Sequence, residues 1–339
     1  MKKFAIGVDL GGTNLRIAAV DETGTLIEKV TIGTKVSLGR DQVIDNMCDA
    51  IQRLSEKCKD SGPLLGIGIG VPGIIDNQTG LLRESPNLPG WADYPVRAEI
   101  ERRLKTIVVL ENDANVAALG EKWLGAARDY SDMAMITLGT GVGGGLVFEG
   151  KIWDGANGMA GEWGHATVEP DGHPCGCGNQ GCLEQYASAT AVVRMAREAI
   201  AANGAPALAR AANSDPEFSA KSIFNLAIQG DEDARRIFRQ VGRSLGIMLS
   251  TLVNTLNLPI YVIGGGASSA WEAFSPAMFE QLRRRSLVYA ATAPDDPAAR
   301  KEGASAVVKP GPGHKTIITQ ALLGSDAGLY GAARLPMIT

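Results

Sequence analysis

The chain has 339 residues, 45% of them hydrophobic and 21% charged, and its formal net charge is −4 at pH 7. These values are typical of a globular protein in water, and the acidic balance argues against a large nucleic-acid surface. No apolar run reaches the roughly 18 residues of a membrane span. The length predicts two domains rather than one core.

The N-terminal segment does not have the pattern of a signal peptide. Lys2 and Lys3 resemble a charged leader, but the apolar run that follows ends at Asp9, which is too short. We therefore expect a cytoplasmic protein whose thiols stay reduced.

Four apolar segments rich in β-branched residues each lead into a cluster of glycines. They are Phe4–Val8, Ile67–Val71, Met133–Leu138 and Ile260–Ile263. Strands that end in glycine turns allow backbone N–H groups to approach a phosphate or a sugar closely. The first and third segments are each followed by another apolar strand, over 15–20 and 145–148. This pattern occurs twice, about 130 residues apart. The repeat predicts two similar halves that each begin with a β-hairpin.

The remaining elements predict an α/β chain. Apolar residues at helical spacing predict helices over 41–59 and 238–256, the second of which we interpret as core. Residues 106–110 predict a short buried strand, and the Pro- and Gly-rich segment 291–315 predicts a loop. The last element, over 320–333, is predicted to be helical. We predict a small α/β domain over 1–117, to which a helix at about 320–337 returns, and a larger α/β domain over 118–319.

Two glycine patterns match the dinucleotide-binding motif, but neither has the sequence context that this motif requires. Residues 139–144 match G-x-G-x-x-G but run into a predicted strand, where a Rossmann unit requires a helix. The match at 68–73 contains Pro72. No P-loop and no protein-kinase motif is present, so these mechanisms are excluded.

Three cysteines and a histidine form the strongest motif of the chain. Cys175, Cys177 and Cys182 lie within eight residues, and His165 precedes them by ten. This set is typical of a closed structural zinc site. His173 is a rival fourth ligand, although Asp-Gly-His-Pro favours an exposed turn. Three free thiols, or a disulfide with one thiol left over, are the alternatives.

Polar residues near these motifs are candidates for ligand binding. Glu162 and Glu184 flank the cysteines, and a metal there would also hold these carboxylates in place for a sugar. Asp113 follows the strand 106–110, a position suited to catalysis, although an Asp there can equally cap a helix. Asn87 is either a turn residue or a ligand donor.

Taken together, these segments resemble the ROK family (repressors, open-reading-frame proteins and sugar kinases), and within it bacterial glucokinases. Residues 9–14 resemble its first phosphate motif, 111–113 its catalytic segment and 139–145 its second phosphate loop. Residues 161–165, with the cysteine-rich run, resemble its sugar and zinc signature, and 263–268 resemble its adenosine-side motif.

The resemblance implies an actin-like, hexokinase-type fold in which two α/β domains close on ATP and a sugar. Asp113 would be the base that accepts the proton of the 6-hydroxyl of glucose, giving glucose 6-phosphate and ADP. The other hydroxyls would be held by Asn87, Asn112, Glu162, His165 and Glu184. The nucleotide and its phosphates would contact Asp9, Gly11, Gly12, Thr13, Asn14, Gly139, Thr140, Gly141, Gly264, Gly265 and Gly266.

The implied cofactors are ATP, Mg2+ and a structural Zn2+ held by His165, Cys175, Cys177 and Cys182. We also expect a homodimer or homotetramer. The alternatives are a kinase of N-acetylmannosamine, fructose or allose, and a kinase that uses polyphosphate. A sugar-sensing repressor is a further alternative, but the first strand begins at Phe4, with no helix-turn-helix before it.

Overall fold

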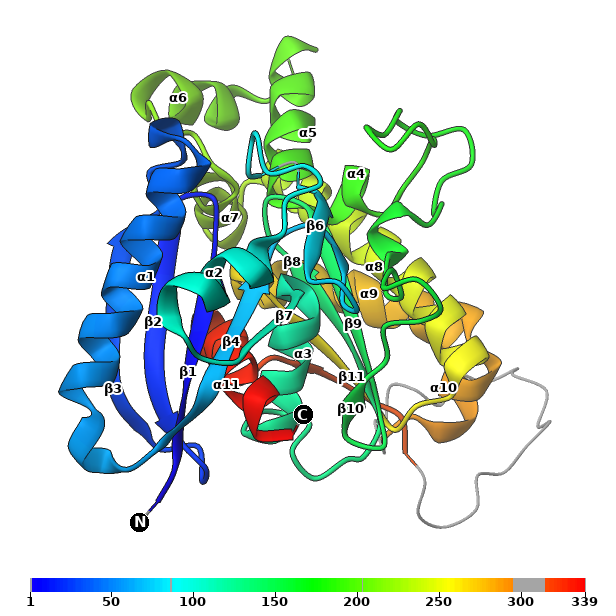
Figure 1. Cartoon of the computed structure of the whole chain (residues 1–339). Coiled ribbons are helices and arrows are strands. Elements are labelled where there is room, and N and C mark those ends of the chain that lie inside the picture. Colours follow the sequence, from blue (N-terminus) through cyan, green and yellow to red (C-terminus); the bar gives the residue numbers. More distant parts are fainter. Residues whose placement is uncertain (1, 86, 203, 295–314, 339) are drawn as a thin grey trace. The chain divides into compact units, whose positions relative to one another are not determined.

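A computed structural model describes residues 2–85, 87–202, 204–294 and 315–338 (Figure 1). The chain forms two compact units. Unit 1 comprises Met1–Met135, Gly145–Gly161 and Ala321–Thr339, and unit 2 comprises Ile136–Gly144 and Glu162–Gln320. No helix among the described residues has both the length and the apolar character needed to cross a bilayer.

Unit 1 contains a five-stranded sheet with the order β3-β2-β1-β4-β7. Its strands are β1 (Phe4–Leu10), β2 (Asn14–Asp21), β3 (Leu26–Gly33), β4 (Leu64–Val71) and β7 (Val108–Asn112). The first three pair antiparallel, whereas β4 is parallel to both β1 and β7. A small two-stranded sheet, β5 (Ile74–Asp76) and β6 (Leu81–Glu84), follows β4.

Two pairs of helices cover opposite faces of the first sheet. Helices α1 (Arg40–Lys57) and α2 (Val96–Leu104) contribute to the same core as alternate residues of β1 and β2. Helices α3 (Asp113–Trp123) and α11 (Ala327–Ile338) pack on the other residues of these strands and on each other. The polar ends of β1, β4 and β7 are therefore held by a sheet that is buried on both faces.

Several glycines of the strands serve helix packing rather than ligand approach. A Cβ atom at Gly68 would lie 1.9 Å from the carbonyl oxygen of Ala332, and one at Gly7 would lie 2.3 Å from that of Leu329. Both carbonyls belong to α11, which can lie this close to the sheet only because these positions lack side chains. Gly68, which belongs to one of the glycine clusters described above, therefore serves helix packing.

Unit 2 carries most of the helices. A second sheet has the order β10-β9-β8-β11-β12, and the boundary between the units passes through β8 and β9. The strands are β8 (Met133–Leu138), β9 (Val142–Phe148), β10 (Lys151–Ile152), β11 (Ile260–Gly264) and β12 (Ile317–Gln320). The helices are α4 (Glu184–Ala187), α5 (Ala189–Ala201), α6 (Pro206–Ser214), α7 (Ala220–Ile228), α8 (Glu232–Leu256), α9 (Trp271–Arg285) and α10 (Leu287–Thr292).

Most predicted elements are confirmed, with one clear error. The mixed α/β class, the hairpin β1–β2 and the helix α1 are as expected, and the predicted strand at 106–110 is β7, displaced by two residues. The predicted C-terminal helix exists, but its predicted start at Gln320 is wrong, because Ile317–Gln320 pairs in parallel with β11 and the helix begins only at Ala327. Of the predicted loop at 291–315, residues 295–314 lie outside the described residues.

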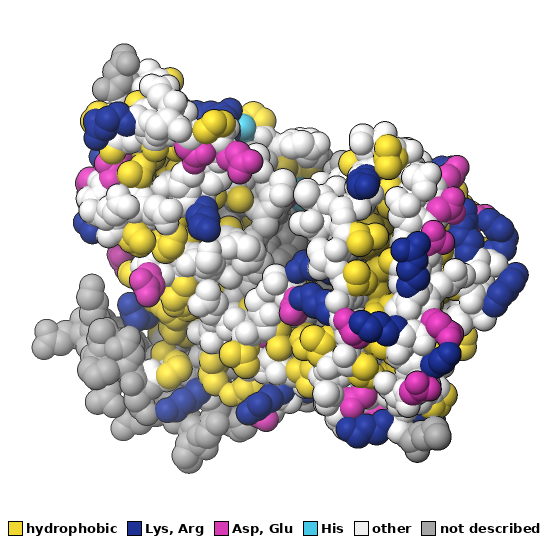
Figure 2. Space-filling view, turned by 90° about the vertical axis from the view of Figure 1, so that its left-hand side faces the viewer, with side chains coloured by type: hydrophobic (Ala, Val, Ile, Leu, Met, Phe, Trp, Pro, Cys, Tyr) yellow, Lys and Arg dark blue, Asp and Glu magenta, His cyan; other side chains and the backbone are white. Residues whose placement is uncertain are grey.

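The face shown in Figure 2 carries basic and acidic side chains next to one another. Within unit 1, the charged atoms of Lys57 and Glu28 lie 2.7 Å apart, and both side chains are exposed. Pairs as exposed as this one contribute little to stability, so the fold depends on the buried cores described above.

Candidate active site

The junction of β7 and α3 places two predicted site residues at the start of a helix. The Asn112 side-chain oxygen accepts hydrogen bonds from the backbone N–H groups of Ala114 (2.8 Å) and Asn115 (3.3 Å). Asn112, and not Asp113, is therefore the N-cap, and its Nδ2 also donates to the carbonyl of Gly73 at 3.1 Å. Asp113 is the first residue of α3, and its carboxylate accepts the Ala114 N–H at 2.9 Å.

The first glycine turn connects β1 and β2 in unit 1. The N–H of Gly11 donates to the carbonyl of Asn14 at 2.9 Å, and the Thr34 hydroxyl donates to the Gly11 carbonyl at 2.6 Å. Thr13 and Asn14 at the tip are exposed. These bonds fix the backbone of the turn while its tip stays accessible to a ligand.

Asp9, at the end of β1, forms an ion pair rather than an open acidic site. Arg16 Nη2 lies 2.5 Å from its carboxylate, and Nη1 of the same guanidinium donates to the Ser325 carbonyl at 2.5 Å. Burial raises the pKa of Asp9, against the opposing effect of Arg16. Because a carboxylate repels phosphate, Asp9 can serve a nucleotide only through a cation.

The segment that carries Asn87 is anchored on both sides of that residue. Leu88 and Trp91 are buried, whereas Asn87 is exposed. The Arg40 guanidinium donates to the Asp41 carboxylate at 3.1 Å and to the Gly90 carbonyl at 3.2 Å. The same guanidinium lies 3.8 Å from the centre of the Tyr94 ring.

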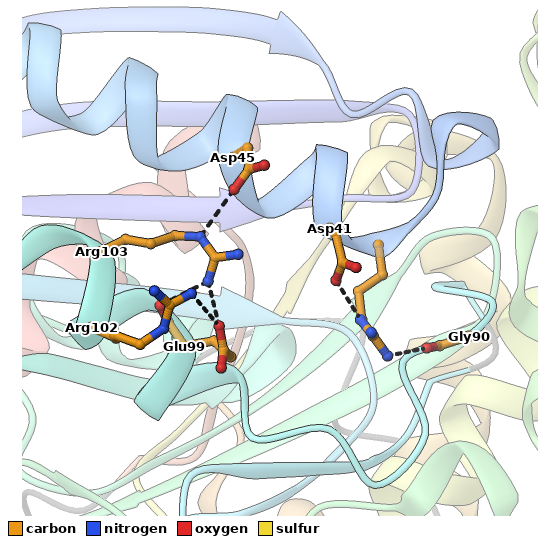
Figure 3. A network of polar contacts seen from close by, with 7 residues as sticks. Asp41, Asp45, Gly90, Glu99, Arg102 and Arg103 are labelled. Carbon is orange, nitrogen blue, oxygen red and sulfur yellow. Dashed lines mark hydrogen bonds and ion pairs between the residues drawn. The ribbon is translucent and has the colours of Figure 1, made fainter.

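A second arginine ties α2 to α1 beside this segment. Arg103 Nε donates to Asp45 at 3.0 Å, and Nη1 of Arg103 lies 2.5 Å from the Glu99 carboxylate (Figure 3). Asn87 thus projects from a loop that is fixed by its neighbours while its own side chain faces solvent.

In unit 2 the four predicted metal ligands converge. One potential ligand atom from each of His165, Cys175, Cys177 and Cys182 lies within 4.8 Å of all the others. The Cys175 sulfur is 3.6 Å from His165 Nδ1, and the sulfurs of Cys177 and Cys182 are 3.8 Å apart. A disulfide would require about 2.05 Å, so that alternative is wrong.

These separations fit a tetrahedral metal. Zinc bonds of about 2.3 Å to sulfur and about 2.05 Å to nitrogen imply edges of about 3.8 Å and about 3.6 Å in a tetrahedron. The four residues can therefore converge on one metal ion. His173 is not part of the group, since its Nδ1 lies 2.8 Å from the Pro174 carbonyl oxygen.

Glu184 connects this cluster to the second glycine turn, within the same unit. Its carboxylate accepts the backbone N–H of Val142 at 2.9 Å. A Cβ atom at Gly141 would lie 2.4 Å from the same carboxylate, so a side chain at this position would displace the carboxylate. Glu162 is exposed, directly before the short 3-10 helix η3 (Trp163–His165). The sequence did not indicate the contact between Glu184 and the turn.

A cavity of about 350 Å3 lies beside the second glycine turn in unit 2. It is lined on one side by Gly139 and Thr140, and on another by Gly266, which begins the 3-10 helix η4 (Gly266–Ala270). Phe224 and Phe238 supply apolar walls. Two segments predicted to bind the nucleotide thus meet at one apolar cavity. Phe238, the first residue of the predicted helix that we interpreted as core, and Phe224, which no sequence pattern marks, are additions to the predicted site.

An apolar cavity beside a glycine turn is suited to binding a nucleotide, and a carboxylate at the end of a strand in an α/β chain is suited to catalysis. The family model "ROK family" matches residues 5–337, and the chain belongs to the ROK family. Its fold is the actin-like fold of ROK sugar kinases.

Two curated relatives and one solved structure define the similarity further. A glucokinase of Halalkalibacterium halodurans is 42% identical over 79% of this chain and 82% of its own. A glucokinase of Thermotoga maritima is 40% identical over 84% of this chain and 87% of its own. A ROK family glucokinase from Streptomyces griseus, solved in complex with glucose and AMPPNP, has 32% identity and a TM-score of 0.75. The match to this structure covers 99% of this chain and 100% of the other.

Proposed function

We infer that this protein is a glucokinase, which transfers a phosphoryl group from ATP to the 6-hydroxyl of glucose. The products are glucose 6-phosphate and ADP. The observation that carries this inference is the identity of 42% and 40% with two glucokinases over about four fifths of the chain. The similar structure with glucose and AMPPNP supports the same pair of ligands.

In the proposed reaction Asp113 is the general base. Its carboxylate accepts the proton of the 6-hydroxyl as that oxygen attacks the terminal phosphorus and ADP leaves. Asn112 caps α3 and so holds Asp113 at the helix start. Asn87, Asn112, Glu162, His165 and Glu184 would hold the remaining hydroxyls.

The nucleotide would occupy the apolar cavity of unit 2 with its base against Phe224 and Phe238, whose rings contact each other edge to face. Backbone N–H groups of the two glycine turns, with the hydroxyls of Thr13 and Thr140, would bind the phosphates. Mg2+ bound to ATP would neutralise phosphate charge, and Asp9 is the carboxylate placed to attract it. Excluding water from the sugar hydroxyl would prevent hydrolysis of ATP.

We propose Zn2+ as the ion of the Cys3His group, on the fit of its separations to a tetrahedron. Four protein ligands leave no open coordination position, so the ion would serve structure and not chemistry. It would hold η3, with Glu162 before it, against the start of α4, where Glu184 lies.

A donor and acceptor panel tests the proposed function. With MgATP we expect glucose to give the highest kcat/KM among glucose, N-acetylmannosamine, fructose and allose, and polyphosphate to be a poorer donor. Glucose that lacks its 6-hydroxyl should inhibit competitively and never be phosphorylated. A higher kcat/KM for another hexose would leave the kinase class intact and overturn the substrate.

The contact between Arg40 and Gly90 predicts a specific effect on sugar affinity. Replacing Arg40 with alanine removes a hydrogen bond and a cation–π contact from the Asn87 segment, each worth about 0.5–1 kcal/mol. We expect the KM for glucose to rise about three- to tenfold with little change in kcat or in the KM for ATP. Arg53→Ala, on an exposed turn of the same helix, is the control. An equal rise of both KM values would contradict this role.

A further inference from the structure

Beneath the catalytic turn lies a buried carboxyl group that the proposed mechanism does not use. Glu111 ends β7 next to Asn112 and is 6% exposed. Its Oε1 accepts the backbone N–H of Asn112 at 2.7 Å and the side-chain amide of Asn115 at 3.0 Å. Its Oε2 accepts the side-chain amide of Asn77 at 3.1 Å. Glu111 therefore contacts the backbone on one side of Asp113 and a side chain on the other.

A second carboxyl group, that of Asp154, faces the same site. The Asn115 amide that donates to Glu111 also lies 3.4 Å from Asp154 Oδ1, so both carboxyl groups converge on one donor. Glu111 is buried and Asp154 is half-buried, and two carboxylates that converge on one donor repel one another, which favours retention of a proton by one of them. Glu111 and Asp154 both belong to unit 1.

In the part of the chain that the structure describes, the groups around these two carboxyl groups are neutral or acidic. Asn77, which follows β5, and Asn115 of α3 are the neutral groups against Glu111, and Asp113 is the next acidic residue on α3. No lysine or arginine of the described residues forms an ion pair with Glu111 or Asp154. The side-chain oxygens of Asn77 and Asn115 are buried and lack a hydrogen-bond partner. The site is therefore short of donors, and a proton would supply one.

We propose that Glu111 and Asp154 hold one proton between them, and that this shared proton positions the β7–α3 turn that carries Asp113. Glu111 is then a positioning residue, and the inference rests on the proposed role of Asp113. Burial, with a smaller contribution from Asp154, raises the pKa of Glu111 to about 7, in agreement with the geometry.

The shared proton has a consequence for stability. A glutamate has a pKa of about 4.5 in the unfolded chain and about 7 here, so the folded protein keeps its proton over a range in which the unfolded chain loses it. The folded state then binds more protons than the unfolded state. Linkage requires the free energy of unfolding to fall as pH rises from about 4.5 to about 7, and this contribution to remain constant above that.

The experiment uses two variants. Glu111→Gln carries permanent N–H groups in place of the proton, and Glu111→Ala removes the polar end of the side chain. At pH 6 the infrared spectrum of the wild type should show a protonated-carboxyl band that is absent from Glu111→Gln and weaker in Asp154→Asn. The fall in unfolding free energy between pH 4.5 and 7 should be reduced in both variants. Glu272→Gln, at an exposed position, should retain the band and the slope.

The kcat values of the two Glu111 variants distinguish a positioning role of Glu111 from a purely structural role. Glu111→Gln should keep kcat within about threefold, whereas Glu111→Ala should lower it about 10- to 100-fold with an unchanged KM for ATP, as expected when a catalytic group is misplaced. Equal losses in both variants, or a wild type without the protonated band, would overturn the proposal. The infrared and stability measurements need no substrate, so failure of the glucokinase function would be distinguishable from failure of this pair.

Discussion

Replacing Asp113 with asparagine is expected to lower kcat for glucose phosphorylation by about 10² to 10⁴, the usual contribution of a general base. The substitution keeps the size of the side chain and its acceptor oxygen, so the Ala114 N–H can still be satisfied. Asn112 remains the N-cap, so α3 should keep its start and the melting temperature should change little. The dissociation constant for glucose, measured by calorimetry, should rise much less than kcat falls.

Asp129→Asn is the matched control for this variant, because the Asp129 side chain is 81% exposed and lies away from the β7–α3 junction. It should retain full turnover. Near-normal kcat in Asp113→Asn would show that another group accepts the proton.

The second large effect is expected from Cys177→Ala. Cys177 is the exposed cysteine of the Cys3His group, so its loss removes a metal ligand with little cost in core packing. Metal analysis should find about one zinc per wild-type chain and almost none in the variant. Because ion binding contributes to folding, the melting temperature should fall by several degrees. The KM for glucose should rise about tenfold or more as Glu162, His165 and Glu184 lose their common anchor.

Cys48→Ala separates loss of metal from loss of packing. Cys48 is buried in the core of unit 1, so this variant should also lower the melting temperature. It should retain full zinc content and an unchanged KM for glucose. A metal-free Cys177→Ala protein with the wild-type KM would contradict the proposed coupling between the ion and the sugar site.

Sequence patterns identified the elements that have a clear hydrophobic period. The stripe from Val43 to Leu54 and the strands around the first glycine turn gave their positions correctly. The C-terminal helix was placed too early because β12 has only four residues, too few to show a period of two. Its pairing with β11 is a tertiary contact that the local sequence does not record.

The candidate site was predictable where its members are neighbours in the chain. The spacing of the three cysteines is recognisable in the sequence, and it predicted that they would converge with His165. Either Asn or Asp can cap a helix, so the sequence did not show which of the two residues is the N-cap. The backbone geometry assigns this role to Asn112 and not to Asp113. The approach of Asp154 to Glu111 joins segments far apart in the sequence, with no motif to mark it.

Glucokinase activity is tested by product analysis with 31P NMR after incubation of the protein with MgATP and glucose. We expect glucose 6-phosphate and ADP in equal amounts, with no phosphate at any other hydroxyl and little free phosphate. Hydrolysis of ATP without phosphorylation of glucose, or phosphorylation at another hydroxyl, would contradict it.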